Sequence, residues 1–428
     1  MPTEAIAGVV VVGAVALLAR GAEVRLVLGL AALGMFAAAG RVAELLGLLA
    51  AEMANARTIV PIASALGFAY ALKRTGCDQH LVHLLVRPLR RARWLLVPGG
   101  VAASYLVNTA IVSQTGAAAA VGPILVPLLR EAGVGPATAG ATLLLGSSMG
   151  GELLNPGTVE VAKLAQLTGL SPAEVVRRGR VPNLLACGAA LLAWWALSRR
   201  DIGKDESDRE VREDLGGTRI NPFRAAVPLI PIALLLVAER LRLPGVLASG
   251  TVQILAAMLV GVVAAGLASP SHAGRLAADF WDGAGYAYTH VISLIVTATV
   301  FAKGIEACGL VARLTSGLSR LPVPARVGAG IGAPWALATL SGTGIGSAIA
   351  VMTALVPAAD SLGLDPVRLG VVSALGAHFG RTMSPVAAVT LFSAGLSGAT
   401  APALVKRVAP PLLVGGTVLF AATVFRLV

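Results

Sequence analysis

An interrupted helix pattern that occurs twice is the feature that most constrains this chain. The first copy runs from Gly146 to Gly169 (GSSMGGELLNPGTVEVAKLAQLTG) and is apolar except for a polar, glycine- and proline-containing middle. The second copy runs from Leu375 to Gly398 (LGAHFGRTMSPVAAVTLFSAGLSG). Four positions of the two breaks correspond: Gly151 with Gly380, Glu152 with Arg381, Asn155 with Ser384 and Pro156 with Pro385. The chain is therefore predicted to be an internal duplication.

The sequence before each break is also repeated. SQTGAAAAVGPILVPLLREAGVGP at 113–136 resembles SGTGIGSAIAVMTALVPAADSLGLDP at 341–366, and FAYALKRTG at 68–76 resembles FAKGIEACG at 301–309. We therefore expect a first repeat at 1–198 and a second at 223–428. The mixed charges of the segment between them, 199–222, predict a solvated cytoplasmic linker.

Composition places the repeats in a membrane. The chain is 56% hydrophobic and only 13% charged, and the runs 5–19 and 245–268 contain no charged residue. These values predict a multi-pass membrane protein. The net charge of +12 comes from lysines and arginines in short loops, which favours contact with lipid headgroups over nucleic acid. Three scattered cysteines predict neither a disulfide framework nor a zinc site.

Ten apolar segments are predicted to cross the membrane. They lie at about 5–19, 24–40, 56–72, 137–169 (broken at 150–157), 181–198, 223–239, 246–267, 286–303, 366–395 (broken at 380–386) and 402–425. Four segments mix apolar and charged residues and are expected at the interface: 42–54, 77–91, 272–285 and 308–320.

The segments 94–129 and 326–359 are expected to be re-entrant hairpins. Each has two short apolar runs around a Ser/Thr/Gly cluster, and the run from Trp94 to Val107 would reach only about 21 Å as a helix. The hydrocarbon core is about 30 Å thick, so this run cannot cross alone. Five crossings and one hairpin in each half predict an all-α fold of two inverted repeats with both breaks at the midplane.

The free N–H and C=O groups at the breaks and hairpin tips predict a binding site for a small ion. Its predicted substrate-binding residues are Asn108, Thr109, Ser113, Thr115, Asn155, Ser341, Thr343, Arg381, Thr382 and Ser384. Glu152, His378, Gly151 and Gly380 are predicted for a coupling-ion site, with Na⁺ at the carbonyls of the breaks and hairpins or H⁺ as the coupling ion, and no cofactor. The polar residues could instead only join helices together.

The charged residues are stronger evidence for a binding site than the polar ones, because a charge near the bilayer centre costs about 2.5–3.5 kcal/mol and usually serves a function. Arg381 is expected to bind an anion, although it could instead form a structural ion pair with Glu152. His378 lies one helical turn before Arg381. It could carry a proton or only hydrogen-bond in the interior.

Three motifs are similar to those of a known family. The SGTG tip at 341–344, the GRTMSPVAAVT run at 380–390 and the GGELLNPG run at 150–157 resemble the anaerobic C4-dicarboxylate transporters of the DcuC type. More broadly, the chain resembles the ion transporter superfamily, which includes the divalent-anion/sodium symporters. This resemblance implies an elevator-type transporter in which hairpins and broken helices move against a scaffold.

The expected function is therefore secondary active transport of a small carboxylate anion, preferentially a C4-dicarboxylate, across the bacterial inner membrane. The alternative is a transporter or ion-coupled antiporter for another small anion or cation. A homodimer in contact with lipid is expected. An intramembrane enzyme is disfavoured because the sequence lacks HExxH and paired aspartates. A channel is disfavoured because it would not need two hairpins that close on one site.

Overall fold

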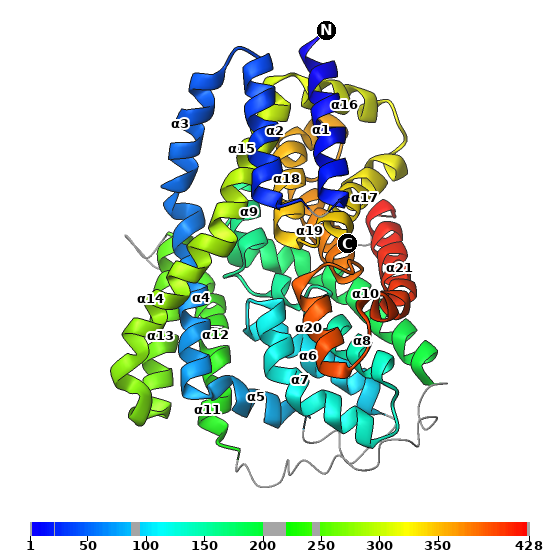
Figure 1. Cartoon of the computed structure of the whole chain (residues 1–428). Helices are drawn as coiled ribbons and strands as arrows, with labels where there is room; N and C mark the ends of the chain where they lie inside the picture. The colour runs from blue at the N-terminus through cyan, green and yellow to red at the C-terminus, as the bar shows by residue number, and fades with distance from the viewer. Residues whose placement is uncertain (1, 21, 87–94, 200–219, 242–248, 426–428) are drawn as a thin grey trace.

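A computed structural model describes residues 2–20, 22–86, 95–199, 220–241 and 249–425, and these residues form an all-helical fold (Figure 1). The helices of the first half are α1 (Thr3–Ala19), α2 (Val24–Ala38), α3 (Val42–Met53), α4 (Ala56–Thr75), α5 (Cys77–Val86), α6 (Leu96–Ala110), α7 (Gln114–Glu131), α8 (Pro136–Ser148), α9 (Val159–Thr168) and α10 (Pro172–Ser198). Those of the second half are α11 (Pro222–Ala226), α12 (Ile230–Leu241), α13 (Gly250–Ala268), α14 (Leu276–Ala287), α15 (Ser293–Ala307), α16 (Leu310–Ser319), α17 (Val323–Ser341), α18 (Gly344–Leu355), α19 (Pro366–Thr382), α20 (Ala388–Ser397) and α21 (Ala401–Val424).

The same order of long and short helices occurs in both halves. The series from α4 to α10 matches the series from α15 to α21, element by element. The short helix after each break ends at a glycine with a left-handed backbone, Gly169 (φ 71°) after α9 and Gly398 (φ 73°) after α20. A side chain would be strained at such a position, so both helices stop at equivalent residues.

The two halves are interleaved. The helix α9 of the first half packs against α18 and α19 of the second, and α20 of the second packs against α7 and α8 of the first. The long helices α10 and α21 pack against each other, α4 packs on α13, and α15 packs on α2. In each half, the helix that follows the break packs against the other half, and both breaks therefore lie in the interior.

Each predicted hairpin consists of two helices joined by a short polar turn. Residues 111–113 join α6 to α7, and Gly342 and Thr343 join α17 to α18. Ser113 caps α7, because its hydroxyl accepts a hydrogen bond from Gly116 N at 3.1 Å, and Thr343 caps α18 in the same way through Gly346 N at 3.4 Å. In Figure 1 the first hairpin lies in the lower part of the molecule and the second in the upper part.

The first break lies where the sequence predicts it. A 3₁₀ turn at Gly151–Leu154 separates α8 from α9. The second break covers residues 383–387, because α19 continues to Thr382, so its predicted start at 380 is wrong by three residues. The physical reason is Pro385, which lacks an N–H and restricts the residue before it, whereas a helix tolerates Gly380.

Two further boundaries differ from the prediction. The helix predicted at 181–198 begins at Pro172, because Ser171 accepts a hydrogen bond from Glu174 N at 3.1 Å and caps it. The predicted interfacial segment 272–285 and the predicted helix 286–303 belong to one helical stretch, Pro270–Ala307, that contains a π-helical turn at Tyr288–Ile292. The aromatic and charged residues of that stretch did not end the helix.

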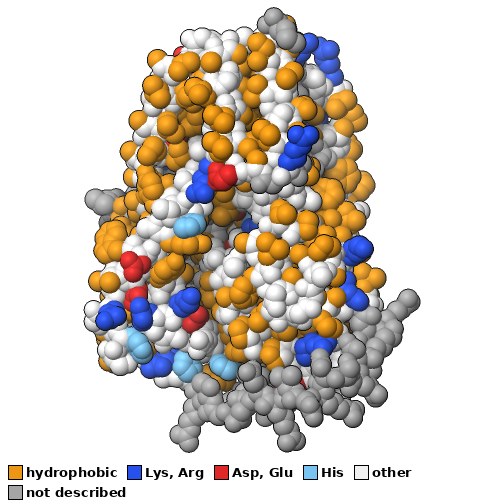
Figure 2. Space-filling model, viewed as in Figure 1, with side chains coloured by type: hydrophobic (Ala, Val, Ile, Leu, Met, Phe, Trp, Pro, Cys, Tyr) orange, Lys and Arg blue, Asp and Glu red, His pale blue; other side chains and the backbone are white. Residues whose placement is uncertain are grey.

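Four stretches of the described chain are long and apolar enough to cross a membrane: Pro172–Ser198, Thr251–Ala268, Pro270–Ala307 and Ala401–Val424. They correspond to four of the ten predicted crossings, and the total stays a prediction. Figure 2 shows apolar side chains over the upper part of one face and charged side chains gathered at its lower left. Parts of the predictions for 1–198, 77–91, 94–129, 246–267 and 223–428, and nearly all of the linker 199–222, lie outside the described residues.

Candidate functional site

Four buried titratable or charged side chains meet at the first break. Nη1 and Nη2 of Arg381, on α19, each lie 3.3 Å from Oε1 of Glu152, on the 3₁₀ turn. Nδ1 of His378 lies 2.9 Å from the same oxygen, and its Nε2 lies 3.2 Å from Oε1 of Glu160 on α9. None of the four residues is more than 4% exposed. We call these four residues the ion cluster, and it contains the Glu152–Arg381 pair considered from the sequence.

Arg381 is held at the C-terminal end of α8. Its Nη2 donates to the backbone oxygen of Ser148 at 2.7 Å, and its Nε donates to the Ser148 hydroxyl at 3.2 Å. Thr382 also donates to that hydroxyl at 2.8 Å. The last carbonyls of a helix carry partial negative charge and lack partners within the helix, so a guanidinium stabilises this end.

Glu152 links the ion cluster to the tip of the first hairpin. Gln114, the first residue of α7, donates its side-chain amide to the carboxylate. Asn108 on α6 donates to Oε2 at 3.3 Å and accepts from Glu152 N at 3.1 Å. A buried carboxylate needs such partners, and here they come from α6, α7 and α19.

The first break is also hydrogen-bonded to the first hairpin. Asn155 donates to the backbone oxygen of Thr109 at 2.9 Å, and the Thr109 hydroxyl donates to the backbone oxygen of Gly151 at 3.0 Å. A Cβ on Gly151 would lie 2.5 Å from the backbone oxygen of Tyr105, so this close approach requires a glycine.

The end of α19, just before the second break, contacts the second hairpin in an equivalent way. The Thr339 hydroxyl donates to the backbone oxygen of Gly380 at 3.1 Å, and a Cβ on Gly380 would lie 2.1 Å from the backbone oxygen of Trp335. At the tip, a Cβ on Gly344 would lie 2.9 Å from Nη1 of Arg381. The tip of the second hairpin therefore reaches the ion cluster.

The predicted site residues fall into separate groups. Those hydrogen-bonded at the ion cluster and the breaks are Asn108, Thr109, Gly151, Glu152, Asn155, His378, Gly380, Arg381 and Thr382. Ser341 and Thr343 bond within the second hairpin, where Ser341 donates to the backbone oxygen of Leu337 at 2.7 Å. Ser384 is buried, and its hydroxyl has no partner in the described part of the chain. Whether Thr115, Asn155, Thr343 and Ser384 converge stays a prediction.

Ser113 and Thr115 line a separate cavity of about 680 Å³ beside the tip of the first hairpin. Tyr70 and Lys73 of α4 and Tyr286 of α14 line its other side. Figure 2 shows this face of the molecule hollowed between the two sides. Gln114, between Ser113 and Thr115, binds Glu152. The cavity therefore lies next to the residue that connects the hairpin tip to the ion cluster.

Sequence reasoning missed several residues of the site. Glu160 contacts His378, Ser148 contacts Arg381, and Gln114 contacts Glu152. Gln114 lies inside the polar tip of the first hairpin, so its position in the sequence is a usable signal. Farther from the cluster, Asn183 of α10 donates to the backbone oxygen of Gly150 at 2.8 Å and accepts from the Tyr105 hydroxyl. These two bonds connect the start of the first break to α10 and α6.

Glu152, Glu160 and His378 each offer a ligand atom, and these atoms lie within 4.8 Å of one another. Such a set has the chemistry to bind a metal ion. The guanidinium of Arg381, however, lies 2.9 Å from Nδ1 of His378 and 3.3 Å from Glu152, so a resident cation already occupies this position. A second cation beside it would be repelled. The arrangement therefore favours an ion-pair network over a metal centre.

Four carbonyls at the broken helices, where Na⁺ is predicted to bind, have protein donors. The backbone oxygens of Ser148, Gly150 and Gly151 accept from Arg381, Asn183 and Thr109, at 2.7, 2.8 and 3.0 Å. The backbone oxygen of Gly380 accepts from Thr339. Na⁺ at these carbonyls would compete with these donors, and the coupling ion stays a prediction.

The sequence of this chain is similar to that of known transporters. A sequence model of one family, described as the C4-dicarboxylate anaerobic carrier DcuC, matches residues 50–428. An uncharacterized transporter of Haemophilus influenzae is 30% identical over 63% of this chain and 99% of its own length. The anaerobic C4-dicarboxylate transporter DcuC of Escherichia coli K12 is 23% identical over 83% of this chain and 78% of its own.

The fold is also similar to that of a solved transporter. The crystal structure of the YdaH transporter of Alcanivorax borkumensis, described as having an unusual topology, superposes with a TM-score of 0.58. The match covers 90% of this chain and 89% of that one at 16% sequence identity. At this identity the likeness concerns the fold alone.

Proposed function

Because the chain belongs to the DcuC family of C4-dicarboxylate anaerobic carriers, we propose that it is a secondary active transporter of a C4-dicarboxylate in the bacterial inner membrane. The family membership agrees with the resemblance predicted from the motifs of the two breaks. The family consists of transporters, not enzymes, and the chain is a multi-pass membrane protein. The C4-dicarboxylate substrate, the transport mechanism and the location in the inner membrane are parts of the proposal.

The observation that carries the proposal is the guanidinium of Arg381. It is buried, and it lies between the end of α8 and the tip of the second hairpin. A guanidinium stays charged at any accessible pH and offers a planar fork that matches a carboxylate. We place one substrate carboxylate on this guanidinium, in exchange for its contacts with Glu152.

We further propose that the two halves are inverted repeats and that transport follows an elevator mechanism. The matching series α4–α10 and α15–α21 and the placement of the hairpins at opposite ends support the inversion (Figure 1). In this proposal the two hairpins, α8, α9, α19 and α20 move together, because they pack on one another around the ion cluster. The helices α2, α4, α13 and α15 would form the scaffold.

The inverted arrangement predicts opposite accessibility for two equivalent positions. Gly135 and Asp365 precede α8 and α19, respectively. Single cysteines placed there, in a background without the three buried native cysteines, are expected to react with a membrane-impermeant maleimide from opposite sides of the membrane. Labelling of both from one side would contradict the inverted repeat.

A specific observation favours a second candidate function, ion-coupled antiport of a small cation. The ion cluster contains two carboxylates, Glu152 and Glu160, against one permanent cation, which leaves one negative charge in excess when both carboxylates are ionised. Such a site could exchange protons for a cation without any anion. The dicarboxylate proposal rests on the family match in addition to the geometry.

Counterflow into proteoliposomes separates the two candidates. Vesicles loaded with unlabelled succinate or fumarate are expected to take up labelled dicarboxylate, and vesicles loaded with a monocarboxylate or an inorganic anion are expected to take up much less. Each arm is run with and without a sodium gradient. If only cation-dependent proton movement occurs and no dicarboxylate exchanges, the antiport function replaces the proposed one.

A further inference from the structure

No single protonation state of His378 satisfies both polar contacts of its Nδ1 atom. Its Nδ1 lies 2.9 Å from Nη2 of Arg381, which can only donate, and 2.9 Å from Oε1 of Glu152, which as a carboxylate can only accept. The neutral ring satisfies Arg381 when Nδ1 carries a lone pair. The charged ring satisfies Glu152 when Nδ1 carries a proton.

Glu160 favours the charged ring. Its Oε1 lies 3.2 Å from Nε2 of His378, and in the described chain His378 is the only hydrogen-bond partner of this buried carboxylate. Nε2 carries a proton in either state, so Glu160 stabilises a positive imidazole without contacting Arg381. The charged groups bonded to the ring are Arg381 on its own helix, Glu152 on the 3₁₀ turn and Glu160 on α9.

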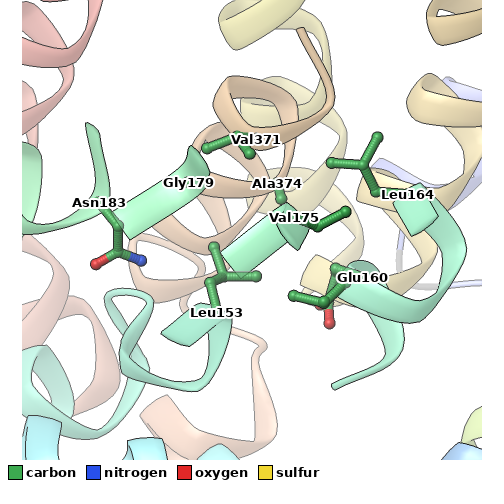
Figure 3. A pocket seen from close by; sticks show the side chains of 9 residues that line it. Leu153, Glu160, Leu164, Val175, Gly179, Asn183, Val371 and Ala374 are labelled. Atoms are coloured by element: carbon green, nitrogen blue, oxygen red, sulfur yellow. The ribbon is translucent and has the colours of Figure 1, made fainter. Parts of the chain in front are cut away.

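A small cavity lies beside Glu160. Its volume is about 20 Å³, and its lining comes from the 3₁₀ turn, α9, α10 and α19. Figure 3 shows Glu160 and Asn183 on different sides of this cavity, with Leu153 and Val175 between them. One water molecule needs a cavity of about 10–15 Å³, so there is space for one next to the Glu160 carboxylate. The ion cluster is therefore not fully packed on the side of Glu160.

We propose that His378 and Glu160 form the proton site that couples anion transport to proton movement, an inference that rests on the proposed function. In the unprotonated state, Nδ1 accepts from Arg381. A proton delivered as hydronium forms a new N–H bond at Nδ1 and leaves a water molecule, and this N–H donates to Glu152. The imidazolium then competes with Arg381 for Glu152 and repels the guanidinium, which frees Arg381 to bind a substrate carboxylate.

The charges of the site agree with this coupling. With both glutamates ionised, Arg381, Glu152, Glu160 and a neutral His378 sum to one negative charge. One proton together with one bound carboxylate leaves that sum unchanged. Because the coupling is reciprocal, anion binding is expected to draw a proton into the site, and a proton is expected to tighten anion binding. The proposal thus specifies one proton for each carboxylate held by Arg381.

The test is Glu160→Gln, which keeps the shape of the side chain and removes its charge. In the wild-type protein, succinate binding measured calorimetrically in buffers of different ionisation enthalpy is expected to take up about one proton per anion. An imposed difference of about one pH unit is expected to accumulate succinate up to about tenfold in vesicles. Glu160→Gln is expected to abolish both effects and to hold succinate counterflow at the low, pH-independent rate that the wild type shows at alkaline pH, because no imidazolium forms to free Arg381.

Two further variants separate coupling from folding. Glu160→Asp retains the charge and is expected to retain proton uptake, and Glu44→Gln, an exposed carboxylate paired with Arg41, is expected to change nothing. Proton uptake that persists in Glu160→Gln, or succinate counterflow that still varies with pH in this variant, would overturn the assignment. Wild-type counterflow without any proton uptake would overturn the coupling alone. A wild-type protein without dicarboxylate counterflow would instead refute the proposed function.

Discussion

Replacing Arg381 with glutamine is expected to lower dicarboxylate counterflow by at least about 100-fold at matched reconstitution. The variant leaves the substrate carboxylate without its cationic partner and also leaves Glu152 buried beside a neutral amide. Losing one partner of a buried charge pair costs about 3–5 kcal/mol, and each 1.4 kcal/mol is tenfold in affinity. The measurement is initial-rate uptake of labelled succinate into proteoliposomes.

Arg381→Lys tests whether charge alone is sufficient, and we expect it to be defective too. The guanidinium contacts Ser148 and Glu152 at the same time through Nε, Nη1 and Nη2. A lysine ammonium is a single point of charge and cannot reproduce this planar set of donors. Transport by Arg381→Lys at the wild-type rate would mean that only the charge is needed.

The double variant Glu152→Gln with Arg381→Gln separates binding from structure. It removes both members of the buried pair, so the thermal stability lost in Arg381→Gln is expected to recover in large part. Counterflow is expected to stay low, because the anion still lacks its cation. If counterflow recovers instead, Arg381 serves only to hold Glu152, and the anion assignment must rest on the helix ends.

The breaks, Glu152 and Arg381 are predictable from local sequence. A glycine, a charge and a proline inside an apolar run have few structural explanations, and their repetition in Gly151–Glu152 and Gly380–Arg381 is enough to mark both breaks. Ser113 and Thr343 indicate the hairpins in the same way, because they are helix caps at the tips. These signals are local, so a single sequence suffices to find them.

Glu160 was not predictable, because its role depends on a partner 218 residues away. In the sequence it is one acidic residue near the start of an amphipathic helix, a position at which glutamate is common and solvated. Only the packing of α9 against α19 buries it beside His378. The start of α10 was missed for a different reason. The predicted helix began at 181, whereas the Ser171 hydroxyl accepts from Glu174 N and caps a helix that begins at Pro172.

Gly380→Ala is expected to be strongly destabilising, although it adds a single methyl group. The new Cβ would lie 2.1 Å from the backbone oxygen of Trp335, and a backbone carbonyl cannot move aside without shifting α17. Overpacking a buried site costs about 1–3 kcal/mol, and we expect the upper end of this range or more. The shift would also disturb the Thr339 hydrogen bond to Gly380 and the neighbouring Arg381. The measurement is the thermal unfolding midpoint in detergent together with the yield of monodisperse protein.

Gly395→Ala is the matched control, because it adds the same methyl group to α20, where a Cβ would meet nothing within 4 Å. Alanine is favoured over glycine in a helix by about 0.5–1 kcal/mol, so this variant is expected to be neutral or slightly more stable. Both residues lie in consecutive helices of the same half, so the difference between the two unfolding midpoints reports on the contact of the second hairpin with the end of α19. Equal unfolding midpoints for Gly380→Ala and Gly395→Ala would show that α17 does not pack against α19 at Gly380, and the placement of the hairpin tip beside Arg381 would lose its support.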